Sequence, residues 1–139
     1  MIVLDTNVLS ETLRPSPSLK VLRWLDEQSA AGVATTTITQ AEMFYGLECL
    51  PAGRRRSALQ QAIEKIFREE FAGRILPFDE DAARTFGSMV AARDALGRPI
   101  SQFDGMIAAI ARSRHASLAT RDRADFEGCG VRVIDPWAG

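Results

Sequence analysis

Four acidic residues occupy similar positions relative to the strands and helices that their surroundings predict. Asp5 follows the apolar run Ile-Val-Leu, and Asp122 follows the run ASLAT. Glu42 and Asp104 are each expected in the first turn of a helix. Carboxylates that cluster without His or Cys are ligands suited to Mg²⁺ or Mn²⁺ rather than to zinc. Such a cluster is suited to metal-assisted hydrolysis of phosphodiester bonds.

Short apolar runs alternate with amphipathic segments along the chain. They predict strands at 2–4, 32–36, 74–78, 116–120 and 131–134, and helices at 7–13, 18–28, 39–50, 53–71, 79–97 and 101–114. The alternation indicates an α/β fold in a single domain, 1–139: an α/β/α sandwich with a short central parallel sheet flanked by helices. Strand ends and helix starts line one crevice in such sheets, so the four acids are expected to meet there.

Each acid also has a plain structural explanation. Thr39 and Glu42 have the spacing of a capping box, and Ser101 and Asp104 resemble one. The two acids that follow strands are placed as N-caps. Caps do not explain why acids fall on four segments predicted to meet. Two carboxylates about 4 Å apart repel by about 4 kcal/mol at an effective dielectric near 20, so a cluster favours a bound cation.

Composition excludes several classes of protein. The 139 residues carry a net charge of -1, which argues against nucleic-acid binding through bulk positive charge. A single histidine, His115, rules out paired-histidine catalysis, and the chain has no P-loop motif. Cys49 and Cys129 lack CxxC spacing and are expected to be free thiols. No apolar run is long enough to span a bilayer and no signal sequence is recognisable, so we expect a cytoplasmic location without membrane contact.

Two other phosphate-handling folds fit less well. A haloacid-dehalogenase-like phosphatase needs a second acid where this chain has Asn7. A phospho-accepting receiver domain needs a lysine after a late strand, and Lys20 and Lys65 both lie too early.

Three segments of the chain stand in a recognisable order and spacing: MIVLDTNVLSE, ITQAEMFYGL and SQFDGMIAAIARSRHASLATRDRADFEGCGVRVIDPW. With them the chain resembles, essentially from end to end, the PIN-domain ribonucleases, and specifically the VapC-type toxins of type II toxin–antitoxin systems. The resemblance implies a PIN-like α/β/α fold and a Mg²⁺- or Mn²⁺-dependent endoribonuclease. It also implies a homodimer, and inhibition by a cognate antitoxin whose tail covers the toxin groove. The toxin–antitoxin complex, a heterotetramer or larger, would bind operator DNA through the antitoxin.

The resemblance also assigns roles to residues. Asp5, Glu42 and Asp104 fall on the acidic positions of the family, and we place Asp122 with them as the fourth catalytic and metal-binding acid. The supporting residues that it implies beside these acids are Thr6, Asn7, Thr120 and Asp125. The threonine hydroxyls are expected to orient metal-bound water or a carboxylate, or to bond the local backbone.

Arginines are the expected contacts to RNA. An acidic site that holds a polyanion needs a cationic rim, and the candidates for it are Arg112, Arg114, Arg121 and Arg123. The run Arg54–Arg56 is interpreted as part of a solvated loop.

Two alternatives to an RNA nuclease remain open: a regulatory module that acts through an antitoxin on operator DNA, and a nuclease that cleaves structured DNA.

Overall fold

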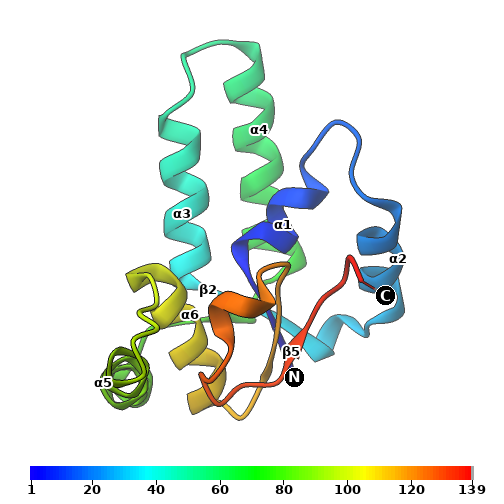
Figure 1. The fold of residues 1–139 in the computed structure, drawn as a ribbon. Coiled ribbons are helices and arrows are strands. Elements are labelled where there is room, and N and C mark those ends of the chain that lie inside the picture. The colour runs from blue at the N-terminus through cyan, green and yellow to red at the C-terminus, as the bar shows by residue number, and fades with distance from the viewer. Residues whose placement is uncertain (139) are drawn as a thin grey trace.

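A five-stranded parallel sheet forms the centre of the computed structural model, which describes residues 1–138 (Figure 1). The strands are β1 (Ile2–Leu4), β2 (Val33–Thr36), β3 (Ile75–Leu76), β4 (Ser117–Ala119) and β5 (Val133–Ile134), in the order β3-β2-β1-β4-β5. This confirms the α/β class and all five predicted strands. The strands β2 to β5 are shorter than predicted, because only the residues within these bounds pair with a neighbouring strand. Gly139, the end of the predicted domain, lies outside the described residues.

Helices cover both faces of the sheet, which confirms the predicted sandwich (Figure 1). One face packs Val3 and Leu118 against Met89 and Ile107, and the other packs Leu4 against the helices of the N-terminal half. The α-helices are α1 (Thr6–Thr12), α2 (Leu19–Glu27), α3 (Thr37–Glu48), α4 (Arg54–Lys65), α5 (Glu80–Ala95) and α6 (Gln102–Ser113). Shorter elements are η1 (Ala30–Gly32), the π-helical η2 (Ile66–Glu70) after α4, and η3 (Arg123–Phe126).

The start of α3 differs from the predicted one. Thr36, still extended at the end of β2, is the N-cap: its hydroxyl accepts a hydrogen bond of 3.0 Å from the Thr39 amide. The predicted N-cap, Thr39, therefore lies inside the helix, and the predicted capping box is wrong. Glu42 lies in the second turn rather than the first, where it has no capping role.

The other capping predictions fare differently. The Asp5 carboxylate caps α1 by accepting from the Thr6 amide, and the Ser101 hydroxyl caps α6 by accepting from the Asp104 amide. Asp122 precedes η3 but makes no side-chain capping bond to it. Arg54–Arg56 form the first turn of α4, which agrees with the predicted helix at 53–71 and shows that the interpretation of this run as part of a loop is wrong. Among residues 1–138, no helix has the length and apolar character needed to cross a membrane.

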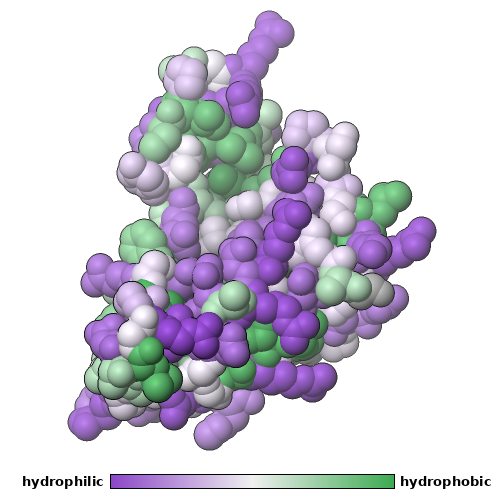
Figure 2. All heavy atoms as spheres, viewed as in Figure 1, coloured by the Kyte–Doolittle hydropathy of each residue, from purple (hydrophilic) through white to green (hydrophobic). Residues whose placement is uncertain are grey.

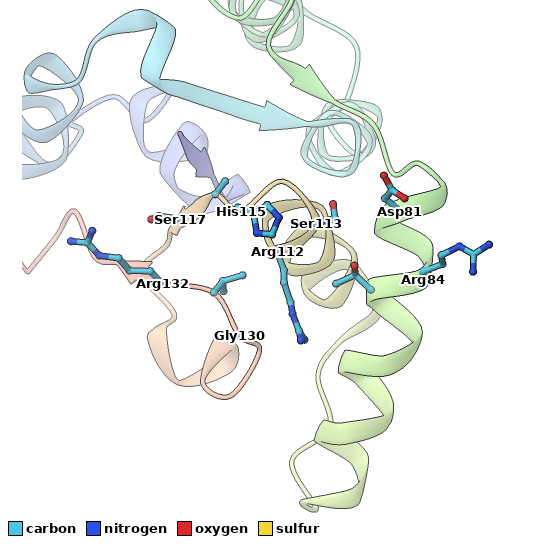
Figure 3. A pocket seen from close by; sticks show the side chains of 11 residues that line it. Asp81, Arg84, Arg112, Ser113, His115, Ser117, Gly130 and Arg132 are labelled. Carbon is cyan, nitrogen blue, oxygen red and sulfur yellow. The ribbon is translucent and has the colours of Figure 1, made fainter.

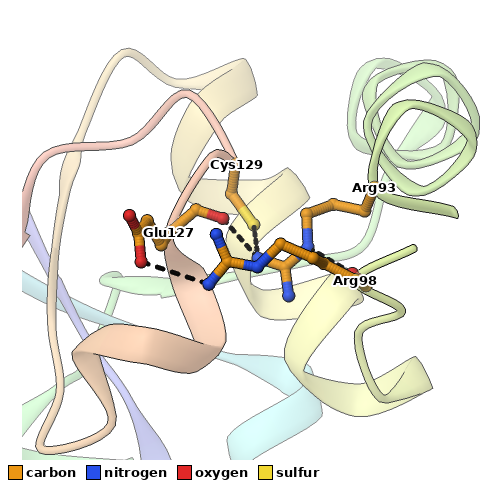
Figure 4. Close-up of polar contacts among 4 residues, drawn as sticks. All are labelled: Arg93, Arg98, Glu127 and Cys129. Atoms are coloured by element: carbon orange, nitrogen blue, oxygen red, sulfur yellow. Dashed lines mark hydrogen bonds and ion pairs between the residues drawn. The ribbon is translucent and has the colours of Figure 1, made fainter. Parts of the chain in front are cut away.

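A buried arginine joins the end of α5 to the segment that precedes β5 (Figure 4). Arg93 is 4% exposed. Its guanidinium donates to the carbonyl oxygen of Arg98 at 2.6 Å, to that of Glu127, and to the Cys129 sulfur at 3.8 Å. A second contact joins the same segments through the Arg98–Glu127 ion pair. Because hydrogen bonds to a charged donor are each worth about 1.5–3 kcal/mol, this arginine anchors the chain that follows η3.

Arg93→Ala is expected to lower the free energy of unfolding by about 3 kcal/mol, because it removes two charge-assisted bonds to carbonyl oxygens and a longer one to the Cys129 sulfur, and it leaves a cavity. Chemical denaturation measures this change. The matched control is Arg68→Ala, which removes an exposed arginine from an ion pair with Glu64 and should change stability by less than about 0.5 kcal/mol. Equal effects of the two substitutions would contradict the anchoring role.

Candidate active site

The candidate site lies where the strand order reverses. From β1 the chain adds β2 and β3 on one side of the sheet and later β4 and β5 on the other, so the ends of β1 and β4 form a topological switch point. Asp5 leaves β1 there, and its amide donates to the carbonyl oxygen of Ala119 at 2.9 Å. The Asp5 side chain is only 4% exposed, and Thr120, which leaves β4, is fully buried.

Hydrogen bonds connect the residues that leave these two strands. The Thr120 hydroxyl donates to Asp5 Oδ2 at 2.8 Å. The Asn7 side-chain amide donates to the Thr120 hydroxyl at 3.3 Å and to Asp122 Oδ2 at 3.1 Å. The Asp122 amide donates to the same hydroxyl at 3.1 Å. Thr120 and Asn7 therefore join Asp5 to Asp122 across the switch point.

A second set of hydroxyls holds Glu42. The Thr6 hydroxyl donates to Glu42 Oε1 at 2.8 Å and lies 3.0 Å from the Thr39 hydroxyl. Thr39 in turn lies 3.4 Å from the hydroxyl of Thr36. These contacts connect the end of β2 to the start of α1 and fix one oxygen of Glu42.

Burial and, to a smaller extent, neighbouring negative charges raise the pKa values of Asp5 and Glu42. Burial is the main cause for Asp5, whose pKa rises from its usual value of 3.8 to about 6 despite the hydrogen bonds from Thr120 and Thr6; the charges of Asp104 and Glu42 add to the rise. Burial also raises the pKa of Glu42, with a contribution from the charge of Asp104. These three acids therefore lie close enough to interact electrostatically.

Two further acids flank this group. The pKa of Asp104 is raised first by burial and then by the charges of Asp125 and Asp122. Both flanking acids are exposed, and the Asp125 amide donates to the Asp122 carbonyl oxygen at 3.1 Å. The structure therefore places Asp104 within electrostatic range of each of the other four acids named from the sequence.

The donor set fits a hard divalent cation. Every acidic ligand candidate offers carboxylate oxygen, and their mutual repulsion is the kind that a cation relieves. Within residues 1–138, no three His, Cys, Asp or Glu side chains are arranged so as to hold one metal ion. Mg²⁺ does not require such a cage, because it usually keeps several waters and takes one or two carboxylates.

The four predicted RNA-binding arginines separate into two pairs. Arg121 and Arg123 flank Asp122, and the Arg121 guanidinium lies 5.3 Å from the centre of the Trp137 ring. Arg112 and Arg114 lie at the other end of α6 from Asp104. The predicted rim beside the acids is therefore reduced to the first pair, because the length of α6 separates the second pair from the site.

Sequence reasoning missed the role of the threonines that precede and open α3. Thr36 was assigned only to the end of a predicted strand and Thr39 only to a helix cap, yet Thr39 also contacts the Thr6 hydroxyl that holds Glu42. The available signal was the run of threonines TTTIT between a predicted strand and a predicted helix. One of them is the cap, which leaves another free to face a neighbouring element.

In the metal-free protein, Asp5→Asn is expected to increase the free energy of unfolding at neutral and higher pH. Because the pKa of Asp5 is raised in the folded state, the folded protein becomes less stable as pH rises through about 6. The loss amounts to about 3 kcal/mol at most, relative to a neutral side chain at this position. The stability difference between Asp5→Asn and the wild-type chain should disappear as pH falls below the usual pKa of 3.8. Denaturation in EDTA across this range measures it, with Asp26→Asn on α2 as control. A wild-type chain more stable than Asp5→Asn above pH 6 would contradict the buried-charge account.

Comparison with known proteins identifies the family. The sequence profile of the PIN domain matches residues 2–128. The chain is 42% identical to "VapC ribonuclease Y4jK" of Sinorhizobium fredii, over 99% of this chain and 98% of that protein. It is 40% identical to "Toxin FitB" of Neisseria gonorrhoeae, over 99% of both.

A solved structure shows the same fold over the whole chain. A chain in "Structure of FitAB bound to IR36 DNA fragment" superposes with a TM-score of 0.93 and 41% sequence identity, covering 99% of this chain and 96% of that one. Family profile, full-length relatives and superposed structure agree. The chain therefore belongs to the PIN-domain family, and within it to the VapC-type toxins.

Proposed function

We propose that the chain is a toxin endoribonuclease that hydrolyses RNA phosphodiester bonds with a bound Mg²⁺ or Mn²⁺ ion. The observation that carries this proposal is the group of three acids, Asp5, Glu42 and Asp104, at the switch point of the sheet, each with a raised pKa. The names of the relatives support the reaction class, since one is called a ribonuclease and another a toxin.

Asp5 and Asp104 are the residues that we assign first to the cation, with Glu42 and Asp122 completing the set. A divalent cation held there would lower the pKa of a water molecule and stabilise charge on the phosphoryl group. Asp5 is suited to this task because its position is fixed: it is buried, and both of its oxygens accept hydrogen bonds, from Thr6 and Thr120.

The remaining residues orient the acids and move protons. Thr6 donates to Oε1 of Glu42, which leaves Oε2 to contact the cation or the water bound to it and to take a proton from that water. A carboxylate with a raised pKa is a better proton acceptor than an ordinary surface acid. Asn7 holds Asp122, and we assign Asp125 a supporting role beside Asp104. Arg121 and Arg123 are the arginines placed to contact the RNA phosphates that flank the scissile bond.

An apolar groove beside Glu42 is the proposed binding site for a cognate antitoxin. The groove has a volume of about 640 Å³ and lies between α1, α3 and α4. Figure 2 shows hydrophobic side chains gathered between α3 and α4, towards the top of the view. Its apolar lining includes Leu13, Met43, Leu47, Leu50, Leu59 and Ile63. Because Thr6 and Glu42 also line it, an antitoxin segment in this groove would block access to the acids.

Contact with operator DNA is proposed to come through the antitoxin. One of the similar solved structures is that of FitAB bound to a DNA fragment. The net charge of -1 supports an indirect role for this chain, since DNA binding depends mainly on neutralised phosphates. A regulatory module that acts only in this way is the alternative function. The homodimer and the cytoplasmic location remain predictions.

Asp5→Asn and Asp104→Asn are each expected to lower the rate of RNA cleavage at least a hundredfold, because a bound divalent cation supplies several kcal/mol of transition-state stabilisation. Antitoxin-free protein is incubated with transfer RNA and ribosomal RNA in Mg²⁺, Mn²⁺ or EDTA. Cleavage should require the metal, and both variants should retain the wild-type circular dichroism spectrum.

The control for charge is Asp26→Asn, which removes an exposed acid on α2 and should leave cleavage unchanged. Duplex and branched DNA substrates are tested in parallel, and their cleavage in place of RNA would favour the structured-DNA alternative. A folded, metal-binding protein that associates with the antitoxin and cleaves neither polymer would contradict the enzyme and favour the regulatory module.

Thr6→Val is expected to reduce cleavage about tenfold to a hundredfold, because Glu42 loses the hydroxyl that fixes its Oε1. Thr6→Ser keeps the hydroxyl and should retain most of the activity. Cleavage rates and Mn²⁺ affinity by calorimetry are compared for both variants. Equal activity of Thr6→Val and the wild-type chain would show that the hydroxyl does not position Glu42.

A further inference from the structure

A second cleft lies at the opposite edge of the sheet from the acids. Its volume is about 720 Å³. It is bounded by the start of α5, the end of α6, the beginning of β4 and the segment before β5 (Figure 3). Arg112 lies eight residues after Asp104 on α6, about 12 Å further along the helix axis. The cleft is therefore separate from the candidate active site.

The cleft carries an excess of positive charge. Three arginines, Arg84, Arg112 and Arg132, line it together with His115, against one acid, Asp81. Arg84 pairs with the exposed acid Glu80 one turn away, which is a weak interaction in solvent. Within residues 1–138, no carboxylate oxygen lies within 4.0 Å of a side-chain nitrogen of Arg112 or Arg132. Two guanidinium groups thus remain available for an anion.

The backbone around the cleft accommodates these side chains closely. Arg112 donates to the carbonyl oxygen of Cys129 at 3.5 Å. Gly130, with φ +77°, lies directly beside it, and a Cβ at this position would come within 3.1 Å of Arg112 Nε and 3.2 Å of Cζ. A Cβ there would push the guanidinium aside slightly, so the glycine leaves room for Arg112 to lie against this backbone.

His115 occupies an unusual backbone position. It follows α6 with φ 55°, and the next amide, that of Ala116, bonds back to the carbonyl oxygen of Ala111. This arrangement normally places glycine at the left-handed residue. Among residues 1–138, His115 is the one non-glycine residue with a positive φ. Histidine at this position has a steric cost that glycine would not have. Its imidazole ring adds a further hydrogen-bonding group to the cleft.

We propose that this cleft binds phosphate groups of the RNA backbone, as a second contact outside the catalytic crevice. The inference rests on the proposed function, since RNA is the substrate assigned there. Guanidinium groups bind phosphate through paired hydrogen bonds, and the lining is mainly polar. A protein-binding surface would have an apolar core, whereas Ala116 and Val131 are the apolar side chains of this lining.

The charge distribution explains why the enzyme needs such a contact. The crevice repels phosphate through its five acids, and only two of the four predicted arginines lie beside it. Cationic side chains that contact the phosphates of a longer RNA must therefore come from elsewhere on the surface. The cleft at the end of α6 supplies them on the same rigid helix that carries Asp104.

The test measures RNA binding separately from cleavage. Fluorescence anisotropy with labelled transfer RNA is recorded in EDTA, on an Asp5→Asn background, at several salt concentrations. Arg112→Gln combined with Arg132→Gln should weaken binding about tenfold and reduce the slope of log K against log salt by about 1.4 to 1.8. Arg132→Gln alone should reduce that slope by about half as much, and it is expected to leave folding intact because Arg132 is exposed.

The control pair, Arg23→Gln combined with Arg68→Gln, removes the same charge from α2 and η2 and should change affinity less than about twofold. Unchanged affinity and salt slope in the cleft variants, while the wild-type chain cleaves RNA, would overturn this inference and leave the proposed function intact. Cleft variants that bind RNA normally but lose the antitoxin would overturn it too. A wild-type chain that neither binds nor cleaves RNA would refute the proposed function first.

Discussion

The burial of the Asp5 carboxylate at the end of the central strand is the constraint on which the rest of the site depends. A charge removed from water in this way is unfavourable unless hydrogen bonds or a cation compensate it. Thr6 and Thr120 supply hydrogen bonds to both oxygens, yet the pKa still rises to about 6. The remaining cost accounts for the proposed cation, and it explains why hydroxyl groups rather than apolar side chains surround the strand ends.

The helix α6 connects the two charged regions of the molecule. Asp104 lies in its first turn and Arg112 in its last, the arrangement that the helix dipole favours. A nearly neutral net charge thus conceals an acidic crevice at one edge of the sheet and a cationic cleft at the other. Arg93, buried at the end of α5, holds the segment between η3 and β5 that completes the cleft. The segment that Arg93 anchors by local packing is therefore also a wall of the cationic cleft.

The sequence predicted the fold and the meeting of the acids because both follow from local patterns. Within residues 1–138, apolar runs and helical spacing identified every strand and every α-helix but not the short helix η1, and parallel topology brings strand ends to one edge. The cap of α3 was assigned to Thr39 instead of Thr36 because several consecutive threonines can each serve. The separation of Arg112 from the acids was overlooked, although it follows from the predicted start of this helix at the crevice and from the position of Arg112 in its last turn. The hydroxyl contacts between Thr6, Thr39 and Glu42 join residues far apart in sequence, which no local pattern encodes.

Anomalous diffraction from crystals soaked in Mn²⁺ would test the central claim most directly, because it locates the ion without relying on activity. The account predicts an anomalous peak at the switch point, with carboxylate oxygens of Asp5 and Asp104 as ligands. Asp5→Asn crystals soaked in the same way should lose the peak. A fully occupied Mn²⁺ ion elsewhere on the surface, with the Asp5 carboxylate still bonded only to Thr6 and Thr120, would contradict the assignment of the metal site.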